Sequence, residues 1–195
     1  MQHTIQAGKY FLLGVAIILG VIILDQYTKW LVMETLLRLN GQETGFLDWL
    51  TTQKKVEFFI NEREPFKTLT LMPFLSFVMV WNQGISFGIF NSNSQGAPLL
   101  LIGMSLIISA MLVIWLALDH RKTVAISLGL IIGGALANVV DRVRFNAVAD
   151  FIDVHVQSYH WPAFNVADSC IVLGAGILML TSLLDKERPN ERKTG

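Results

Sequence analysis

Residues 163–184, AFNVADSCIVLGAGILMLTSLL, form an apolar run with Asn165 and Asp168 near its start. A membrane helix needs about 20 mainly apolar residues, because the hydrocarbon core of a bilayer is about 30 Å thick. A carboxylate placed at hydrocarbon is costly unless it is paired or has a function. The run therefore predicts a membrane helix that begins at a polar site.

Three further runs, at 11–33, 97–118 and 123–140, are also long and apolar enough to span a bilayer. The chain has 195 residues, of which 53% are hydrophobic and only 15% are charged. Soluble domains usually contain about 25% charged residues. We therefore expect a mainly α membrane protein, in which one domain, 1–195, contains four transmembrane helices.

Basic residues in short flanks predict the orientation of these helices, because such residues are retained in the cytoplasm. Those at the N-terminus, in the loop 119–123 and in the C-terminal tail are Lys9, Arg121, Lys122, Lys186, Arg188, Arg192 and Lys193. Both termini are thus expected to be cytoplasmic. The segments 34–96 and 142–162 would be periplasmic, and the polar tail 185–195 would be disordered.

The segment 34–96 contains a candidate β-hairpin. An apolar run at 69–81 is too short to span a membrane, and Asn82, Gln83 and Gly84 separate it from a second apolar run at 85–90. Two apolar runs around an Asn/Gly turn are typical of a hairpin. We expect a β-hairpin whose apolar faces are covered by the surface of the outer leaflet or by the outer ends of the helices.

Two aspartates bracket the point at which the chain enters its last helix. Asp150 lies in a stretch, 147–152, with a strand-like alternation, and Asp168 lies in the first turn of the helix. Two such carboxylates can share a proton and activate water, as in aspartyl peptidases. The alternative for Asp150 is a solvent-facing acid on a strand. The alternative for Asp168 is an acid that the helix dipole stabilises in the first turn, although Asn165 already fits the N-cap position.

Three other charged residues lie within or at the end of predicted helices. Asp25 and Lys29 have i,i+4 spacing, which favours an ion pair near the outer interface with Lys29 reaching toward the headgroups. Asp141 would end the third helix, where the helix dipole disfavours an acid. We expect Arg142 or a neighbouring element to compensate its charge, which favours a structural or supporting role.

The sequence favours neither a metal nor a nucleic acid as a ligand. Asp150, Asp153, His155 and His160 match no common zinc spacing, so we expect no metal and no cofactor. The formal net charge is zero, which argues against a nucleic-acid partner.

Five ordered groups of residues resemble the bacterial lipoprotein signal peptidase family, also called signal peptidase II. They are Asp25-Gln26-x-x-Lys29, Asn82-x-Gly84-x-Ser86-Phe87-Gly88, Gly133-Gly134-Ala135-x-x-Asn138-x-x-Asp141-Arg142, Val148-x-Asp150-Phe151 and Pro162-Ala163-Phe164-Asn165-x-Ala167-Asp168-Ser169. The match covers most of the chain. In three respects the chain departs from the family: Ala137 and Asn146 each replace a usual glycine, and segment 39–66 is longer than is usual. Asparagine adopts left-handed backbone geometry more readily than most residues, so we expect the turn at Asn146 to be retained.

The resemblance implies a fold of four membrane helices with a small periplasmic β-sheet cradle. It also implies an enzyme with Asp150 and Asp168 as its catalytic pair. The positions that would support the site or hold substrate are Asn82, Gly84, Asn138, Asp141, Arg142 and Asn165, with Asp25 and Lys29. The implied substrate is a prolipoprotein with a diacylglyceryl group on a cysteine, cut just before that cysteine by water that the pair activates. We expect a monomer in the bacterial inner membrane, surrounded by lipid, with its active site at the periplasmic face.

Two other classes of protein remain as alternatives. A small ion or proton-coupled transporter would also contain intramembrane acids, but it predicts polar residues at several depths. The run 97–118 contains no charged residue, and the acids lie toward one side of the membrane. A non-enzymatic scaffold would tolerate replacement of both aspartates.

Overall fold

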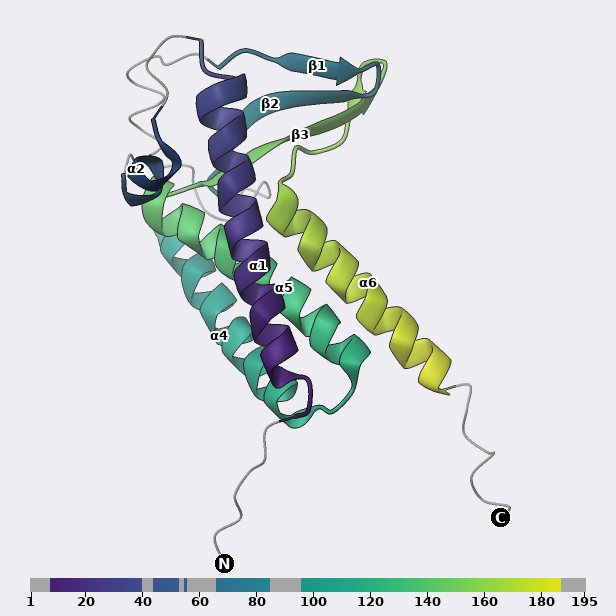
Figure 1. Cartoon of the computed structure of the whole chain (residues 1–195). Helices are drawn as coiled ribbons and strands as arrows, with labels where there is room; N and C mark the ends of the chain where they lie inside the picture. Colours follow the sequence, from purple (N-terminus) through teal and green to yellow (C-terminus); the bar gives the residue numbers. More distant parts are fainter. Residues whose placement is uncertain (1–7, 40–43, 53–54, 56–65, 85–95, 187–195) are drawn as a thin grey trace, which may run out of the picture.

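Four long helices form one end of the molecule, and a small sheet covers the other (Figure 1). The computed structural model describes residues 8–39, 44–52, 55, 66–84 and 96–186. Its long helices are α1 (Phe11–Trp30), α4 (Gly96–Leu118), α5 (Lys122–Phe145) and α6 (Val166–Lys186), and α1 continues into a π-helical segment, η1 (Leu31–Leu36). Each is long and apolar enough to cross a membrane, α1 together with η1, which confirms the four predicted helices.

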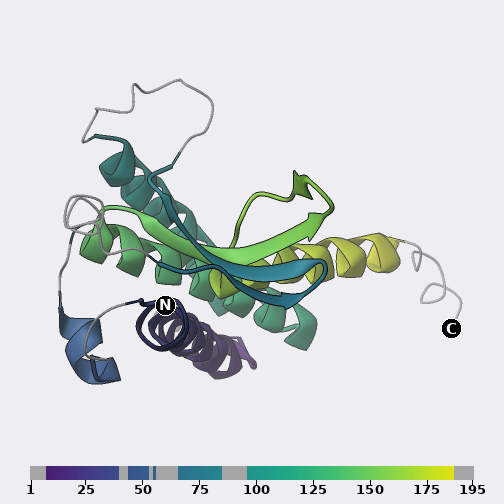
Figure 2. The same cartoon turned by 90° about the horizontal axis from the view of Figure 1, so that it is seen from above.

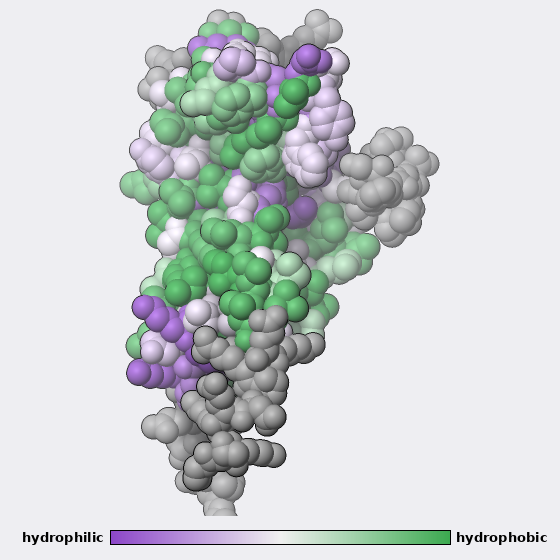
Figure 3. Space-filling model, turned by 90° about the vertical axis from the view of Figure 1, so that its right-hand side faces the viewer, coloured by the Kyte–Doolittle hydropathy of each residue, from purple (hydrophilic) through white to green (hydrophobic). Residues whose placement is uncertain are grey.

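Helix α5 is the centre of the helical part, because it contacts α1, α4 and α6. Its Leu128 and Ile132 are fully buried against apolar residues of α1 and α4. In contrast, α4 and α6 expose large apolar side chains, such as Ile107 and Val172. The helices form a broad hydrophobic area in Figure 3, with hydrophilic residues above it, around the sheet, and below it. An apolar exterior of this kind suits lipid as the surrounding solvent.

Small residues allow α5 to approach its neighbours closely. A Cβ atom added at Gly133 would lie 2.8 Å from Val21 of α1, and one added at Gly134 would lie 2.4 Å from the carbonyl oxygen of Ala167 in α6. Close approach through small residues is typical of membrane helices. Gly134 therefore lets the first turn of α6 rest directly on α5.

The sheet is antiparallel, with the order β1-β2-β3-β4. Its strands are β1 (Leu69–Met72), β2 (Leu75–Asn82), β3 (Val148–Val156) and β4 (Tyr159–His160), and a short helix, α2 (Phe46–Thr51), lies beside the top of α1. Seen from above, β2 and β3 run across the ends of the helices (Figure 2). Residue Phe164 adds a bridge to Ile152 of β3 immediately before α6 begins, so the sheet is joined to the helical part at this point.

The hairpin differs from the one that we expected. The run 69–81 is not a single strand: it turns at Pro73 and Phe74 and pairs with itself as β1 and β2. Proline lacks an amide donor and fixes φ, so it favours this turn. Residues 85–90, which we expected to form the second strand, lie outside the described residues, as does most of the tail 185–195.

The third predicted helix ends, and the fourth begins, at a residue other than the one expected. Helix α5 continues past residue 140 to Phe145 and ends at Asn146, which has a left-handed backbone with φ 62°. Asparagine tolerates this conformation better than most residues, so the expected turn at Asn146 is confirmed. Helix α6 begins at Val166 rather than at 163, because the preceding residues pair with β3.

Candidate active site

Asp150 lies in β3, at the place where the sheet meets the helices, and only 2% of its surface is exposed. The expectation of a solvent-facing strand acid is therefore wrong. The carboxylate accepts two hydrogen bonds, one from Nδ2 of Asn82 at 3.0 Å and one from Nδ2 of Asn165 at 2.8 Å. Asn82 comes from the adjacent strand β2, so two separate elements orient the Asp150 side chain.

Asp168 lies in the first turn of α6 and is half-buried. Its amide donates to Oδ1 of Asn165 at 2.9 Å, and its Oδ2 accepts from the Asn165 amide at 3.2 Å. This reciprocal pair is a capping arrangement, which satisfies two amides at the start of the helix. Asp168 is thus the helix N-terminal acid that the alternative describes, yet its Oδ1 also accepts from Nδ2 of Asn138 at 2.9 Å.

Two asparagines connect the carboxylates of Asp150 and Asp168. Asn165 donates from Nδ2 to Asp150 and from its backbone amide to Asp168, so both acids contact one residue. The same Nδ2 lies 3.2 Å from Oδ1 of Asn138, which leaves Nδ2 of Asn138 to face Asp168. Both aspartates consequently lie at one site, although β3 and α6 contribute them separately.

A buried lysine lies behind this site. Lys29 Nζ is 2.7 Å from Asp25 and 2.6 Å from Asp141, and all three side chains are fully buried. A third acceptor, Oδ1 of Asn138, lies 3.5 Å away. The expected ion pair with Asp25 is present, but the expectation that Lys29 reaches toward the headgroups is wrong. The ammonium group has three N–H donors, and three acceptors in the interior lie close to it, so the side chain does not need to extend to water.

The two acids of this ion cluster also bind the backbone around the site. Asp25 Oδ1 accepts from the amide of Ala167 in α6 at 2.9 Å, and Asp141 Oδ2 accepts from the amide of Ala149 in β3 at 3.1 Å. Ala167 and Ala149 each precede one of the paired aspartates. The cluster of Asp25, Lys29 and Asp141 therefore fixes the backbone on which Asp150 and Asp168 are carried.

We expected Arg142 or a neighbouring element to compensate Asp141, and the neighbouring helix α1 does so, because its Lys29 makes the ion pair. Asp141 also does not lie at a helix end, since α5 continues to Phe145. Arg142 is half-buried and donates from Nη1 to the carbonyl of Asn138 at 3.3 Å. Its Nε is buried and has no hydrogen-bond partner in the described part of the chain. Its positive charge interacts with both Asp150 and Asp168.

Sequence reasoning assigned no role to two further polar residues. Gln26 donates to Asp141 at 2.7 Å and accepts from Arg144 at 2.9 Å, and both side chains are buried. Arg144 also binds the carbonyl of Trp49 and lies over its ring, 4.0 Å from the centroid. For Gln26 the available signal was a polar side chain within an apolar run. For Arg144 it was the i,i+3 spacing from Asp141.

Gly84 is linked to the site by a hydrogen bond to Asn82. Its amide donates to Oδ1 of Asn82 at 2.9 Å, which leaves Nδ2 of Asn82 free to face Asp150. The backbone φ at Gly84 is +93°, a conformation that other residues rarely adopt, and an added Cβ would lie 2.2 Å from Leu101. Glycine at this position thus allows the turn that orients Asn82.

Burial raises the pKa of Asp150 to about 7, and the negative charge of Asp168 contributes in the same direction. The hydrogen bonds from Asn82 and Asn165 and the charge of Lys29 act against this rise. Two interacting carboxylates titrate as a pair. At neutral pH a site of this type can hold one proton and one negative charge, which is the arrangement that activates water in aspartyl enzymes.

Comparisons with known proteins show the family of this chain. The family model described as signal peptidase (SPase) II matches residues 17–184. A lipoprotein signal peptidase of Coxiella burnetii is 34% identical over 157 residues, which are 80% of this chain and 90% of that protein. Another, from Methylobacterium sp. (strain 4-46), is 43% identical over 114 residues, which are 58% of this chain and 69% of that protein.

A solved structure of a bacterial membrane enzyme has a similar fold, with a TM-score of 0.68. It is 24% identical in sequence, and the match covers 97% of this chain and 99% of that one. This similarity concerns the fold alone.

Proposed function

Because the chain belongs to the signal peptidase II family, we propose that it is an aspartic endopeptidase that removes the signal peptide from diacylglyceryl-modified prolipoproteins. Cleavage falls just before the lipidated cysteine. The observation that supports this proposal most strongly is the convergence of Asp150 and Asp168 on Asn165, at the junction of sheet and helices.

In the proposed reaction the pair of carboxylates carries one proton. Asp150 holds it, because its pKa of about 7 is well above that of an ordinary aspartate. Asp168, the more exposed member, acts as the base of the pair: it takes a proton from water, which then attacks the scissile carbonyl. The Asp150 proton polarises that carbonyl, and proton transfer to the nitrogen lets the amine leave. The reaction requires no acyl-enzyme intermediate and no metal.

Arg142 and the two asparagines position the substrate and the acids. The positive charge of Arg142 interacts with both Asp150 and Asp168, so its guanidinium group lies where it can orient a substrate carbonyl. Asn138 and Asn165 each bind a carboxylate and each other, so they keep the pair at a fixed separation. Positioning of this kind can supply about 7–11 kcal/mol of the reduction in the barrier.

The membrane supplies the remaining specificity. The helices lie in the bacterial inner membrane with both termini in the cytoplasm, so the sheet and the paired aspartates lie at the periplasmic face. The acyl chains of the substrate stay in the outer leaflet and hold its cysteine at a constant depth. The large apolar side chains exposed on α4 and α6 support a lipid contact at this depth.

The direct experiment compares two precursors that differ only in lipidation. Purified protein is incubated with a diacylglyceryl-modified prolipoprotein and with its unlipidated twin, and the cleaved products are sequenced. We expect cleavage of the lipidated precursor alone, with the cysteine as the new N-terminus. Equal cleavage of both precursors, or cleavage elsewhere, would contradict the proposed specificity.

The same assay tests the absence of a metal from the reaction. We expect EDTA to leave the cleavage rate of the lipidated precursor largely unchanged, because the proposed chemistry uses carboxylates and water only. Complete inhibition by EDTA, reversed by added metal, would contradict this part of the proposal.

A further inference from the structure

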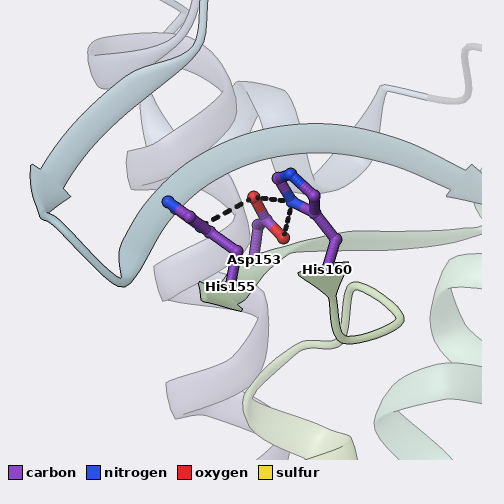
Figure 4. Close-up of side chains that lie close together, drawn as sticks. All are labelled: Asp153, His155 and His160. Carbon is purple, nitrogen blue, oxygen red and sulfur yellow. Dashed lines mark hydrogen bonds and ion pairs between the residues drawn. The ribbon is translucent and has the colours of Figure 1, made fainter. Parts of the chain in front are cut away.

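Three residues with metal-binding side chains, Asp153, His155 and His160, lie together at the edge of the sheet (Figure 4). Asp153 and His155 are two residues apart on β3, so their side chains point to the same face of the strand. His160 of β4 pairs directly with His155. One ligand atom from each residue lies within 4.8 Å of the other two.

The cluster is partly enclosed, and one of its nitrogens lacks a hydrogen bond. Asp153 is 6% exposed, and its two oxygens lie 2.9 and 3.0 Å from Nδ1 of His160. Nδ1 of His155 lies 3.3 Å from the same carboxylate, but it is buried and makes no hydrogen bond within the described residues. A buried polar atom without a partner is uncommon, so a missing ligand is a physical explanation for it.

This cluster is separate from the paired aspartates. Side chains alternate along a strand, so Asp150 and Asp153 point to opposite faces of β3. Asp150 is also engaged by Asn82 and Asn165. The four residues that sequence spacing grouped together therefore divide into one acid of the candidate active site and a group of three on the other face.

We propose that Asp153, His155 and His160 bind a divalent transition-metal ion of the zinc type, which links β4 to β3. One carboxylate and two neutral imidazoles are ligands that zinc prefers, and water would complete the coordination. Ligand atoms around tetrahedral zinc lie roughly 3.3 Å apart, given bond lengths of about 2.0–2.1 Å. Two of the observed distances, 2.9 and 3.3 Å, are close to this value.

In a zinc complex the ligating nitrogens of His155 and His160 would also have to come to this separation. His160 can rotate to allow this, because its side chain is 55% exposed. The rings of His155 and His160 are already stacked, with centroids 4.9 Å apart. Strand β4 has only two residues, and a shared ion would fix it to β3. This inference does not depend on the peptidase reaction, because it uses none of the residues assigned to it.

The test measures zinc binding by untagged protein in detergent micelles, after treatment with a chelator and its removal. Calorimetric titration with Zn²⁺ should show one bound ion per chain. His160→Ala and His155→Ala should lower the affinity by more than about tenfold, since even loss of an outer-sphere partner costs about 10–100-fold. His120→Ala is the matched control, because His120 is an exposed histidine beyond the end of α4.

A second measurement, of the melting temperature, distinguishes a loss of zinc binding from misfolding of a variant. Zn²⁺ should raise the melting temperature of the wild-type protein and of His120→Ala, but not that of His160→Ala, whose metal-free melting temperature should match the wild type. An ion pair between Asp153 and protonated histidines, without a metal, predicts no saturable zinc binding. That result, or binding that His155→Ala and His160→Ala leave unchanged, would overturn the proposal.

Discussion

Asn165 connects the two carboxylates of the candidate site and also begins α6. Its side-chain amide donates to Asp150, while its backbone amide donates to Asp168 and its Oδ1 accepts from the Asp168 amide. Asn165 therefore both caps α6 and binds the carboxylates of the candidate site. The two interpretations of Asp168, helix acid and member of a pair, do not exclude one another.

At the residue scale, burial raises the pH at which Asp150 loses its proton, and Asn82 lowers it. Its hydrogen bond lowers the pKa of Asp150, so Asn82→Ala should raise that pKa above about 7. Activity needs the protonated acid, so it falls as pH rises through this pKa, and the variant should lose activity at a higher pH. One hydrogen bond predicts a shift of roughly 0.5–1 pH unit in the alkaline limb of kcat/KM.

The control for this pH profile is Gln83→Ala, because Gln83 is an exposed neighbour of Asn82. Its alkaline limb should coincide with that of the wild type. An alkaline limb that stays in place or moves to lower pH in Asn82→Ala would contradict the assignment of the proton to Asp150.

Lys29 is the residue whose loss should be most damaging to stability. Lys29→Met leaves the buried carboxylates of Asp25 and Asp141 without their cation, which should lower the free energy of unfolding by about 3–5 kcal/mol. Chemical unfolding in detergent measures the change. Lys122→Met, at the exposed start of α5, is the control. Adding Asp25→Asn to Lys29→Met should recover part of the loss, and a loss no larger than that of Lys122→Met would contradict the role of Lys29.

At the scale of elements, the contact of α5 with the first turn of α6 positions Asp168. Gly134→Ala would place a methyl group 2.4 Å from the Ala167 carbonyl, so α6 must move. We expect a loss of about 1–3 kcal/mol in stability and a lower cleavage rate. Gly176→Ala is the matched helical control, since among the described residues no atom beyond its own stretch of helix lies within 4 Å of its added Cβ. Equal effects of the two substitutions on stability and cleavage would show that this contact does not position the site.

Most of the helical elements could be predicted from the sequence, because membrane spans are long and apolar. The end of the third helix could not be predicted, since in the sequence the charged Asp141 indicates the end of a membrane span. In the structure it lies in the interior, where Lys29 of α1 neutralises it, and α5 continues until Asn146. A partner that comes from a distant helix leaves no local signal in the sequence.

The sheet was predicted less well than the helices. The run 69–81 contains a turn at Pro73, which makes two strands of what we expected to be one. The acids Asp25 and Asp168 could be singled out from the sequence, since polar groups at membrane helices need a reason. Asn82 and Gly84 were indicated only by the resemblance to the family. The hydrogen bonds of the site could not be predicted, because Asn138 and Asn165 come together only when α5 and α6 pack.

At the scale of the whole molecule, the proposed orientation places the sheet in the periplasm. In a Cys170→Ala background, Met72→Cys lies at the exposed end of β1 and His120→Cys at the opposite end of the molecule. A membrane-impermeant maleimide added to cells with a permeabilised outer membrane should label position 72 but not position 120. Disruption of the inner membrane should then expose position 120. The reverse pattern would contradict the orientation.

The central claim is that Asp150 and Asp168 together activate the attacking water. The most direct measurement is the single-turnover cleavage rate of diacylglyceryl-modified precursor by Asp150→Asn and by Asp168→Asn, with the exposed Asp48→Asn as control. The account predicts that each of the first two lowers the rate by about 10²–10⁴-fold and that the control cleaves normally. Cleavage at the wild-type rate by either Asp150→Asn or Asp168→Asn, in a protein that is folded, would contradict it.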